Sequence, residues 1–282
     1  MAGKRAGIAS WIAYLPLKIL VDALIALPSW MREALFIFIL ERLGPLVPAS
    51  RQLFDNVKSA SGQVPLGDHK DFGHSVWRFW GKAIAQMIAP GPVALTWEGH
   101  PDALALLADA NQRALVITAH IGPMEWLRRP QPNVHQGLGL MYRSYNNPLV
   151  EKEVQRRLLQ SHAPVFNKRR AGSLGAIRYV KQGHKLLMTA DQHHSRGERI
   201  QFLGAPAMAS PGPIHMSASL DCPIIPARLT LARGRWTVLV NAPVYGAHEK
   251  QHHQWLQNQI ESWVRREPHL WLWLHHRWRV RG

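Results

Sequence analysis

Short apolar segments that favour β-structure alternate with longer amphipathic segments through most of this 282-residue chain. This alternation limits the fold more than any other feature, because strands separated by helices pair most readily in a parallel sheet that the helices cover. We predict strands at 113–119, 137–143, 184–191, 222–232 and 235–244. We predict helices at 70–89, 101–111, 147–161, 173–183, 212–221 and 250–268. The predicted fold class is α/β, an αβα sandwich on a central, largely parallel sheet.

The N-terminal region reads differently, as an apolar segment at 8–28 that is about long enough to cross a bilayer. Pro16, Lys18 and Asp22 interrupt it, and a charge inside a membrane is costly. Lys18 and Asp22 lie one helical turn apart, so they are spaced to pair on a helix.

A second apolar segment follows at 32–48, and we interpret 8–47 as a membrane-associated helical region with the basic N-terminus on the cytoplasmic side. A signal peptide and a buried helical hairpin are the alternatives. We predict two parts, a membrane-associated helical region at 1–67 and one further domain at 68–282.

The charge and the cysteine content of the chain limit the classes of binding partner and the compartment that it suits. Lys and Arg number 34 against 18 Asp and Glu, a formal net charge of +16. Such a chain favours polyanionic partners, namely nucleic acid, anionic lipid, phosphorylated substrates or acidic carrier proteins. Cys222 is the single cysteine, which excludes a disulfide framework and a thiolate zinc site and fits a reducing compartment.

The stretch "ALVITAHIGPMEW" at 114–126 carries a histidine at the end of a predicted strand and a glutamate five positions later. Functional groups gather where the strands of an open α/β sheet end. A carboxylate bonded to one nitrogen of His120 fixes its tautomer and leaves the other nitrogen as a general base. His120 and Glu125 are therefore the candidate catalytic pair, able to take a proton from an alcohol.

The same pattern, histidine then an acid five positions on, occurs again at His193 and Glu198. With 16 histidines and 18 acidic residues, about one such match is expected by chance. The second match lies in a segment that we interpret as a polar loop with no strand delivering its histidine. Position therefore favours His120, with a structural histidine as the alternative.

Four blocks in order resemble one family: "TAHIGPMEW", "MYRSYNNPLVEKEVQRRL", "LLMTADQHHSRGERIQFLGAPAMASPGPIHMSA" and "IESWVRREPHLWLWLHHRW". Together they resemble the late acyltransferases of lipid A biosynthesis, the lauroyl and myristoyl transferases of the lysophospholipid acyltransferase superfamily. The resemblance is close over 114–279 and looser in the N-terminal region.

The resemblance implies a membrane-bound O-acyltransferase that moves a fatty acyl chain from acyl carrier protein to a hydroxyl of a lipid A precursor. His120 is then the base and Glu125 its partner. It implies no cofactor and no metal, because acyl carrier protein delivers the chain as a substrate. Further substrate-binding candidates are Arg143, Asn146, Asp191, Gln192, Arg169 and Arg170. The implied partners are acyl carrier protein, a phosphorylated glycolipid and the cytoplasmic face of the anionic inner membrane, without nucleic acid.

Several alternatives stay open. A relative of the same family could acylate another lipid or a polyene, or a glycerolipid acyltransferase could use acyl-CoA. A basic protein without catalysis could bind anionic membrane or nucleic acid. Arg143 could be one more solvated cation, and Asp191 could cap a turn. Ser75 in "GHSVW" and Cys222 are poor nucleophile candidates, and the adjacent histidine pairs are poor chelates.

Overall fold

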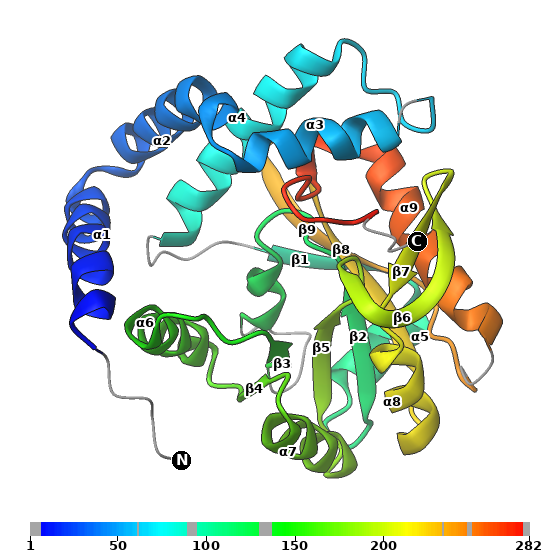
Figure 1. Ribbon diagram of the computed structural model, residues 1–282. Coiled ribbons are helices and arrows are strands. Elements are labelled where there is room, and N and C mark those ends of the chain that lie inside the picture. The colour runs from blue at the N-terminus through cyan, green and yellow to red at the C-terminus, as the bar shows by residue number, and fades with distance from the viewer. Residues whose placement is uncertain are drawn as a thin grey trace.

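The computed structural model describes residues 7–60, 62–88, 95–129, 137–232, 234–246 and 250–278. Within these residues, a seven-stranded sheet has the order β1-β9-β8-β2-β5-β3-β4, and β6 and β7 pair separately (Figure 1). Every neighbouring pair in the large sheet is parallel except β8 with β9. The predicted fold class, α/β on a largely parallel sheet, is confirmed.

The large sheet consists of β1 (Leu95–Gly99), β2 (Ala114–Thr118), β3 (Gly139–Tyr142), β4 (Val165–Asn167), β5 (Lys185–Thr189), β8 (Ile224–Ala232) and β9 (Arg235–Val240). The separate hairpin pairs β6 (His193–Phe202) with β7 (Ala205–Ala209). The helices are α1 (Ile8–Ala26), α2 (Ser29–Leu43), α3 (Ala49–Ser59), α4 (His69–Ile88), α5 (Pro101–Ala108), α6 (Pro148–Leu158), α7 (Arg170–Lys181), α8 (Gly212–Leu220) and α9 (Lys250–Arg266). Short 3₁₀ segments are η1 (Gly44–Leu46), η2 (Met124–Arg128), η3 (Leu159–Ser161) and η4 (Pro268–Leu270).

Strand β2 lies in the middle of the sheet and is buried along its whole length. Leu115 and Ile117 point into one hydrophobic core, which α3, α4, α7, α8 and α9 help to fill. Ala114 and Val116 point into the second core, on the other face. Because successive strand residues face opposite sides, a strand covered on both faces needs an unbroken apolar run. The sequence ALVIT meets that requirement, which is why the strand is recognisable from sequence.

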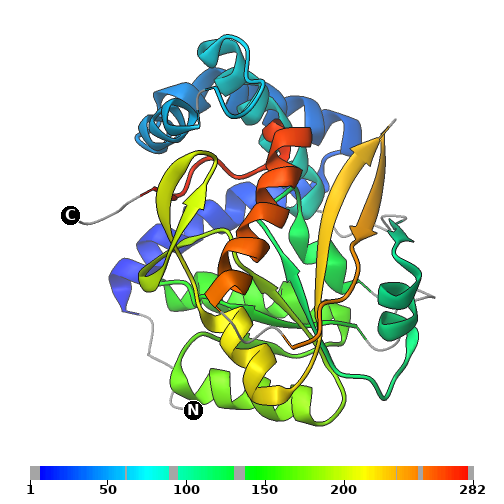
Figure 2. The ribbon, with the colours of Figure 1, turned by 90° about the vertical axis from the view of Figure 1, so that its right-hand side faces the viewer.

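The prediction missed β1, β4 and the β6–β7 hairpin. The interpretation of the segment around 193–198 as a polar loop was wrong, because β6 runs through it. Its polar side chains are compatible with a strand because, among the described residues, β6 pairs with β7 alone and stays exposed along much of its length. Figure 2 shows α9 running between this hairpin and the β8–β9 pair.

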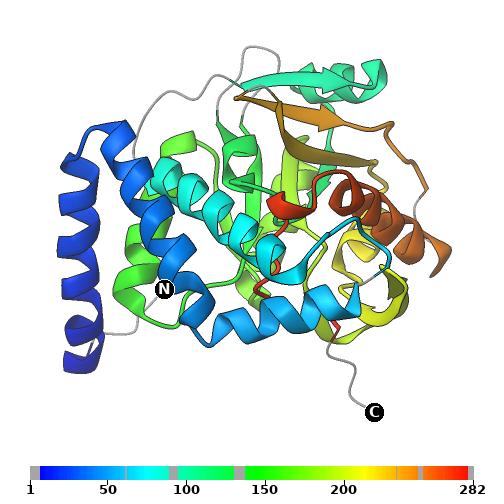
Figure 3. The ribbon, with the colours of Figure 1, turned by 90° about the horizontal axis from the view of Figure 1, so that it is seen from above.

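The N-terminal helices differ in how much they contact the rest of the protein. Helix α1 lies at the margin of the molecule (Figure 3) and is long and apolar enough to cross a membrane. Its charged residues Lys18 and Asp22 pair at 2.5 Å, as their spacing predicted. Trp11, Ile12 and Ile19 are among its many exposed apolar side chains.

Helices α2 and α3 are tied to the domain that follows them. Arg32 of α2 is buried and its Nε donates to the main-chain oxygen of Ala85 in α4. Leu53 and Val57 of α3 belong to the first core. The predicted division at residue 67 stays a prediction, while residues on both sides of it share this core.

Candidate active site

Strands β2 and β5 are neighbours, and each ends two residues before a side chain that carries chemistry. Their register pairs Thr118 with Thr189, and the Ala190 amide continues the pairing by donating to the Thr118 carbonyl oxygen at 3.0 Å. His120 and Asp191 therefore emerge side by side at the carboxyl edge of the sheet, where α/β proteins place their sites. The chain then turns at Gly122, whose φ of 60° suits glycine.

Asp191 and His120 form a closely bonded pair. Asp191 Oδ1 lies 2.8 Å from His120 Nδ1, and Asp191 Oδ2 accepts from the His120 main-chain amide at 2.9 Å. Asp191 is fully buried, while the His120 side chain keeps 20% of its exposure. Because a carboxylate only accepts, the proton of neutral His120 lies on Nδ1 and Nε2 keeps a free lone pair. The Gln192 amide nitrogen lies 3.5 Å from that Nε2.

Asp191 and His120 each stabilise the charged form of the other. Burial alone lowers the pKa of His120, but the attraction and hydrogen bond of Asp191, together with the charge of Glu125, raise it above its ordinary value. Burial alone raises the pKa of Asp191, but the charge and hydrogen bonds of His120 hold it well below its ordinary range. Asp191 is therefore ionised at neutral pH, and His120 is a stronger base than a free imidazole.

Glu125, the partner that the sequence suggested for His120, lies in η2 and is partly buried. Burial raises its pKa, and the charge of His120 lowers it in part. Its carboxylate thus interacts electrostatically with His120, while the hydrogen bond at Nδ1 belongs to Asp191. The role of Glu125 as the catalytic partner stays a prediction.

Two cations stand at the same edge of the sheet. Tyr142 of β3 pairs with Asn167 of β4, so Arg143 and Lys168 follow neighbouring strands. Burial lowers the pKa of Lys168, opposed by Asp191 and reinforced by Arg143, and Lys168 in turn lowers the pKa of His120. The structure therefore brings predicted Arg143 near the site and adds Lys168, which sequence reasoning missed because β4 is only three residues long.

The remaining predicted substrate residues lie farther along the same loops. Asn146 is exposed just before α6, and its neighbour Asn147 caps that helix by accepting from the Leu149 amide. Arg169 and Arg170 are exposed at the start of α7. Within the described residues, none of these side chains forms a hydrogen bond or an ion pair with His120, so their roles stay predictions.

The second histidine–glutamate pair is arranged differently. His193 and Glu198 both lie in β6, opposite Ala209 of β7, with a bulge between them. The charge of Glu198 raises the pKa of His253 in α9 against the lowering effect of burial. No strand of the large sheet delivers this pair, which agrees with the preference for His120.

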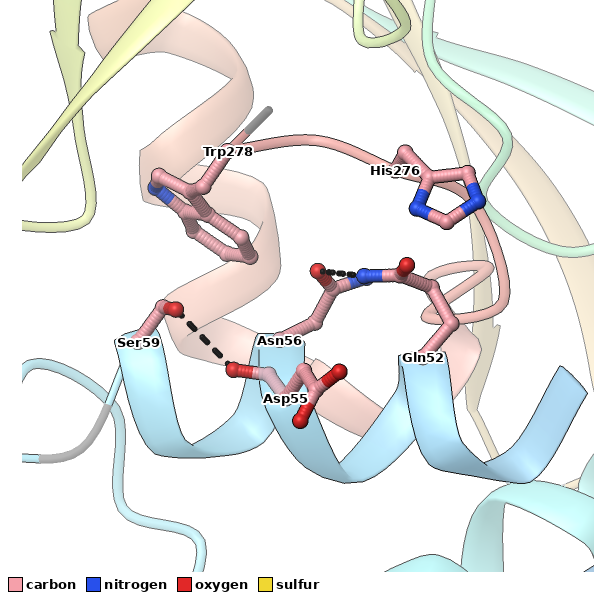
Figure 4. Close-up of a pocket in the computed structure, with 6 residues that line it drawn as sticks. All are labelled: Gln52, Asp55, Asn56, Ser59, His276 and Trp278. Carbon is pink, nitrogen blue, oxygen red and sulfur yellow. Dashed lines mark hydrogen bonds between the residues drawn. The ribbon is translucent and has the colours of Figure 1, made fainter. Parts of the chain in front are cut away.

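A polar hollow of about 260 Å³ lies beside α3, lined by Gln52, Asp55, Asn56, Ser59, His276 and Trp278 (Figure 4). Neither His120 nor Asp191 lines it. One face of α3 and the residues just after His275 form its wall. The hollow is therefore adjacent to the C-terminal segment whose His275 contacts Asp191.

Ser75 and Cys222, the two poor nucleophile candidates, lie in surroundings that do not activate them. The Ser75 hydroxyl in α4 donates to the Phe72 main-chain oxygen, and burial raises the pKa of Cys222 to about 11. In the part of the chain that the structure describes, no three His, Cys, Asp or Glu side chains are grouped to hold a metal ion.

The site is thus an ionised aspartate bonded to an accessible histidine at the carboxyl edge of a largely parallel α/β sheet, an arrangement that is chemically capable of general base catalysis. The model of the family described as bacterial lipid A biosynthesis acyltransferase matches residues 79–280. This range covers most of the chain and includes the site, so the protein belongs to that acyltransferase family. Comparison with curated proteins finds no match to this chain.

Proposed function

We propose that this acyltransferase moves a fatty acyl chain from the thioester of acyl carrier protein to a hydroxyl of a lipid A precursor, with His120 as the general base. The observation that carries the proposal is the hydrogen bond between His120 Nδ1 and buried Asp191. It leaves Nε2 unprotonated on an imidazole that keeps 20% of its side-chain exposure.

In the proposed reaction, Nε2 of His120 takes the proton of the acceptor hydroxyl as its oxygen attacks the thioester carbonyl carbon. The new C–O bond forms, the C–S bond breaks, and the proton held by His120 passes to the departing thiolate. Asp191 stabilises the transient imidazolium without accepting its proton. Glu125 contributes its negative charge to the same imidazolium, which gives the predicted pair an electrostatic role.

Arg143 and Lys168 are proposed to bind phosphate at the mouth of the site. Both side chains reach solvent; Arg143 follows β3, which pairs with β5, and Lys168 follows β4, which pairs with β3. A guanidinium and an ammonium together match a phosphate of either the carrier's pantetheine arm or the glycolipid. We propose that Arg169, Arg170 and Asn146 contact the same substrates farther out, and that Gln192 orients the acceptor beside Nε2.

We also propose that α1 holds the protein on the cytoplasmic face of the inner membrane. The support is the apolar length of α1 and its exposed side chains, which no described part of the protein covers. The net charge of +16 favours the anionic lipid of that face. It also suits acidic acyl carrier protein as the donor.

The test is lipid mass spectrometry on a Gram-negative host that lacks its own late acyltransferase. The host carries the wild-type chain, the His120→Ala variant or the His193→Ala variant as a matched control. We expect lipid A with one added acyl chain from the wild type and the control only. An acylated lipid other than lipid A would overturn the acceptor, and the same products from His120→Ala would overturn the mechanism.

A further inference from the structure

We propose that Trp271 and His275 are positioning residues that hold Asp191 in place for its work on His120. Both lie in the closing segment, defined here as residues 271–278. This inference rests on the proposed function, because it assumes that the His120–Asp191 pair performs the chemistry. Neither residue needs to touch the substrate.

The contacts surround Asp191 on the side away from His120 Nδ1. The Trp271 indole Nε1 donates to Asp191 Oδ2 at 2.9 Å, and His275 Nε2 lies 3.1 Å from the Asp191 main-chain oxygen. Oδ2 also accepts from the His120 amide, so one oxygen is held by two donors and the other faces the imidazole. The carboxylate plane is therefore fixed by groups from two distant parts of the chain.

His275 acts as a donor in one defined protonation state. A carbonyl oxygen only accepts, so the hydrogen of His275 lies on Nε2. Its Nδ1 is buried and has no hydrogen-bond partner within the described residues. Burial lowers the pKa of His275 to about 4, despite the attraction of Asp191, so the ring is neutral at the pH where His120 works. Burying an imidazole with one nitrogen unpaired costs folding free energy. The hydrogen bond from His275 to Asp191 gives a functional reason for a histidine at this position.

The closing segment is itself anchored from both sides. The Leu272 amide donates to the His120 main-chain oxygen at 2.8 Å, and Trp271 forms an antiparallel bridge with Ile121. From the other side, the Asn56 amide donates to the main-chain oxygens of Trp273 at 2.7 Å and His275 at 2.6 Å.

Figure 4 shows Asn56 on the wall of the hollow, with Gln52 bonded to it. The closing segment is therefore hydrogen-bonded to helix α3 on one side and to the loop after β2 on the other. The chain of contacts runs from α3 through the closing segment to Asp191 and then to His120.

Several titratable groups face the pair and enter any pH profile. They come from η2, the loop after β4 and the closing segment: Glu125, Lys168, His275 and Arg277. A tryptophan substitution changes none of these charges, so Trp271→Phe isolates the loss of one donor.

The central experiment compares Trp271→Phe with Trp273→Phe. Both indoles are fully buried in the same segment and their rings lie 4.8 Å apart, but Trp273 donates to the Pro268 main-chain oxygen instead of Asp191. We expect kcat of Trp271→Phe to fall about tenfold, as for loss of a hydrogen bond to a charged group. KM should change little, and the acid limb of the kcat/KM profile should move to lower pH as Asp191 loosens from His120.

Trp273→Phe should keep the wild-type acid limb even where its stability is reduced. Equal kcat losses in both variants with an unmoved acid limb would assign Trp271 a purely structural role and overturn the proposal. An acid limb moved to higher pH in Trp271→Phe would overturn it as well, because it would mean that Asp191 binds His120 more strongly without the indole.

His275 offers a second, independent test through a conservative variant. The amide nitrogen of His275→Gln can reach the place of Nε2, whereas His275→Phe keeps a ring and loses the donor. We expect the glutamine variant to retain most of kcat and the wild-type acid limb, and the phenylalanine variant to lose about tenfold in kcat. Equal activity of the two variants would overturn the role of His275.

The proposed function fails separately from this inference. If His120→Ala retains activity, the base assignment falls whatever the tryptophan variants do. If His120→Ala is inactive while Trp271→Phe and Trp273→Phe behave alike, the base assignment stands and the positioning role falls.

Discussion

The two histidine–glutamate segments have the same spacing and opposite surroundings. His120 follows a central strand buried on both faces, and its imidazole is bonded to buried Asp191. His193 and Glu198 lie within the two-stranded β6–β7 unit, much of which faces solvent. The residues at the two positions are chemically identical, so spacing alone does not make a site.

The difference shows what the fold adds to the motif. Neighbouring parallel strands end together, so a group after β2 meets a group after β5 although the two are 71 positions apart in the sequence. Asp191, reached in this way, is fully buried and bonded to His120, whereas Glu198 in β6 is only partly buried. The hydrogen-bonded unit is therefore His120 with Asp191, which we propose as the functional unit, with Glu125 adding charge to it.

The largest effect should come from Asp191→Asn compared with Glu198→Gln. Asparagine keeps the shape but removes the charge and favours the wrong tautomer of His120. We expect kcat/KM to fall roughly 10² to 10⁴-fold for Asp191→Asn, the range of general base catalysis. Glu198→Gln should stay close to wild type in the same acyl-transfer assay, and a comparable loss there would erase the distinction between the two segments.

Glu125→Gln should have a smaller effect. It removes the charge that helps to raise the pKa of His120 while leaving the Asp191 bond in place. We expect kcat to fall about tenfold, and the acid limb of the pH profile to move to lower pH. A loss as large as that of Asp191→Asn would show that Glu125 is the principal partner, as its place in the motif first suggested.

Substitution of the cations should affect binding more than chemistry. Arg143→Met with Lys168→Met removes two charges at the mouth of the site, and we expect KM for the phosphorylated substrate to rise about tenfold. Arg196→Met with Arg199→Met, on exposed positions of β6, is the matched loss of two charges. Equal KM changes in the two double variants would indicate a general charge effect only.

Stability should show the smallest effect, through His275. Burial lowers its folded-state pKa to about 4 from an ordinary value of 6.5, so between these pH values the unfolded chain binds more protons than the folded one. Stability therefore decreases as pH falls through this window. The depressed pKa of Asp191 acts below the window and the raised pKa of His120 acts above it.

We expect His275→Gln to lose part of this dependence when Tm is measured from pH 4 to 6.5. His252→Gln, a partly buried histidine of α9, is the control. An unchanged slope in His275→Gln would contradict the assigned titration.

The fold was predictable where burial imposes a recognisable pattern of apolar residues on the sequence. Strand β2, buried on both faces, reads as an apolar run, and helices α4 and α9 repeat their buried positions at helical spacing. Strand β4 has three half-buried residues and leaves no such trace, so Lys168 behind it stayed hidden.

The place of His120 after a buried strand was predictable because it is local information, while its catalytic role stays a prediction. The bond from His120 to Asp191, and the bonds of Trp271 and His275 to Asp191, join residues that the sequence keeps at least 71 positions apart. Their partners depend on strand order, which local patterns do not contain. From the sequence, Asp191 was named as a site residue, but the carboxylate partner of the His120 ring was assigned to Glu125, which is nearer in the sequence.

The most direct test of the central claim is acyl transfer by purified His120→Ala and His193→Ala in lipid vesicles. Circular dichroism on both variants checks that each is folded. The account predicts a loss of roughly 10² to 10⁴-fold in kcat for His120→Ala and a rate near wild type for His193→Ala. Wild-type turnover by folded His120→Ala would contradict it.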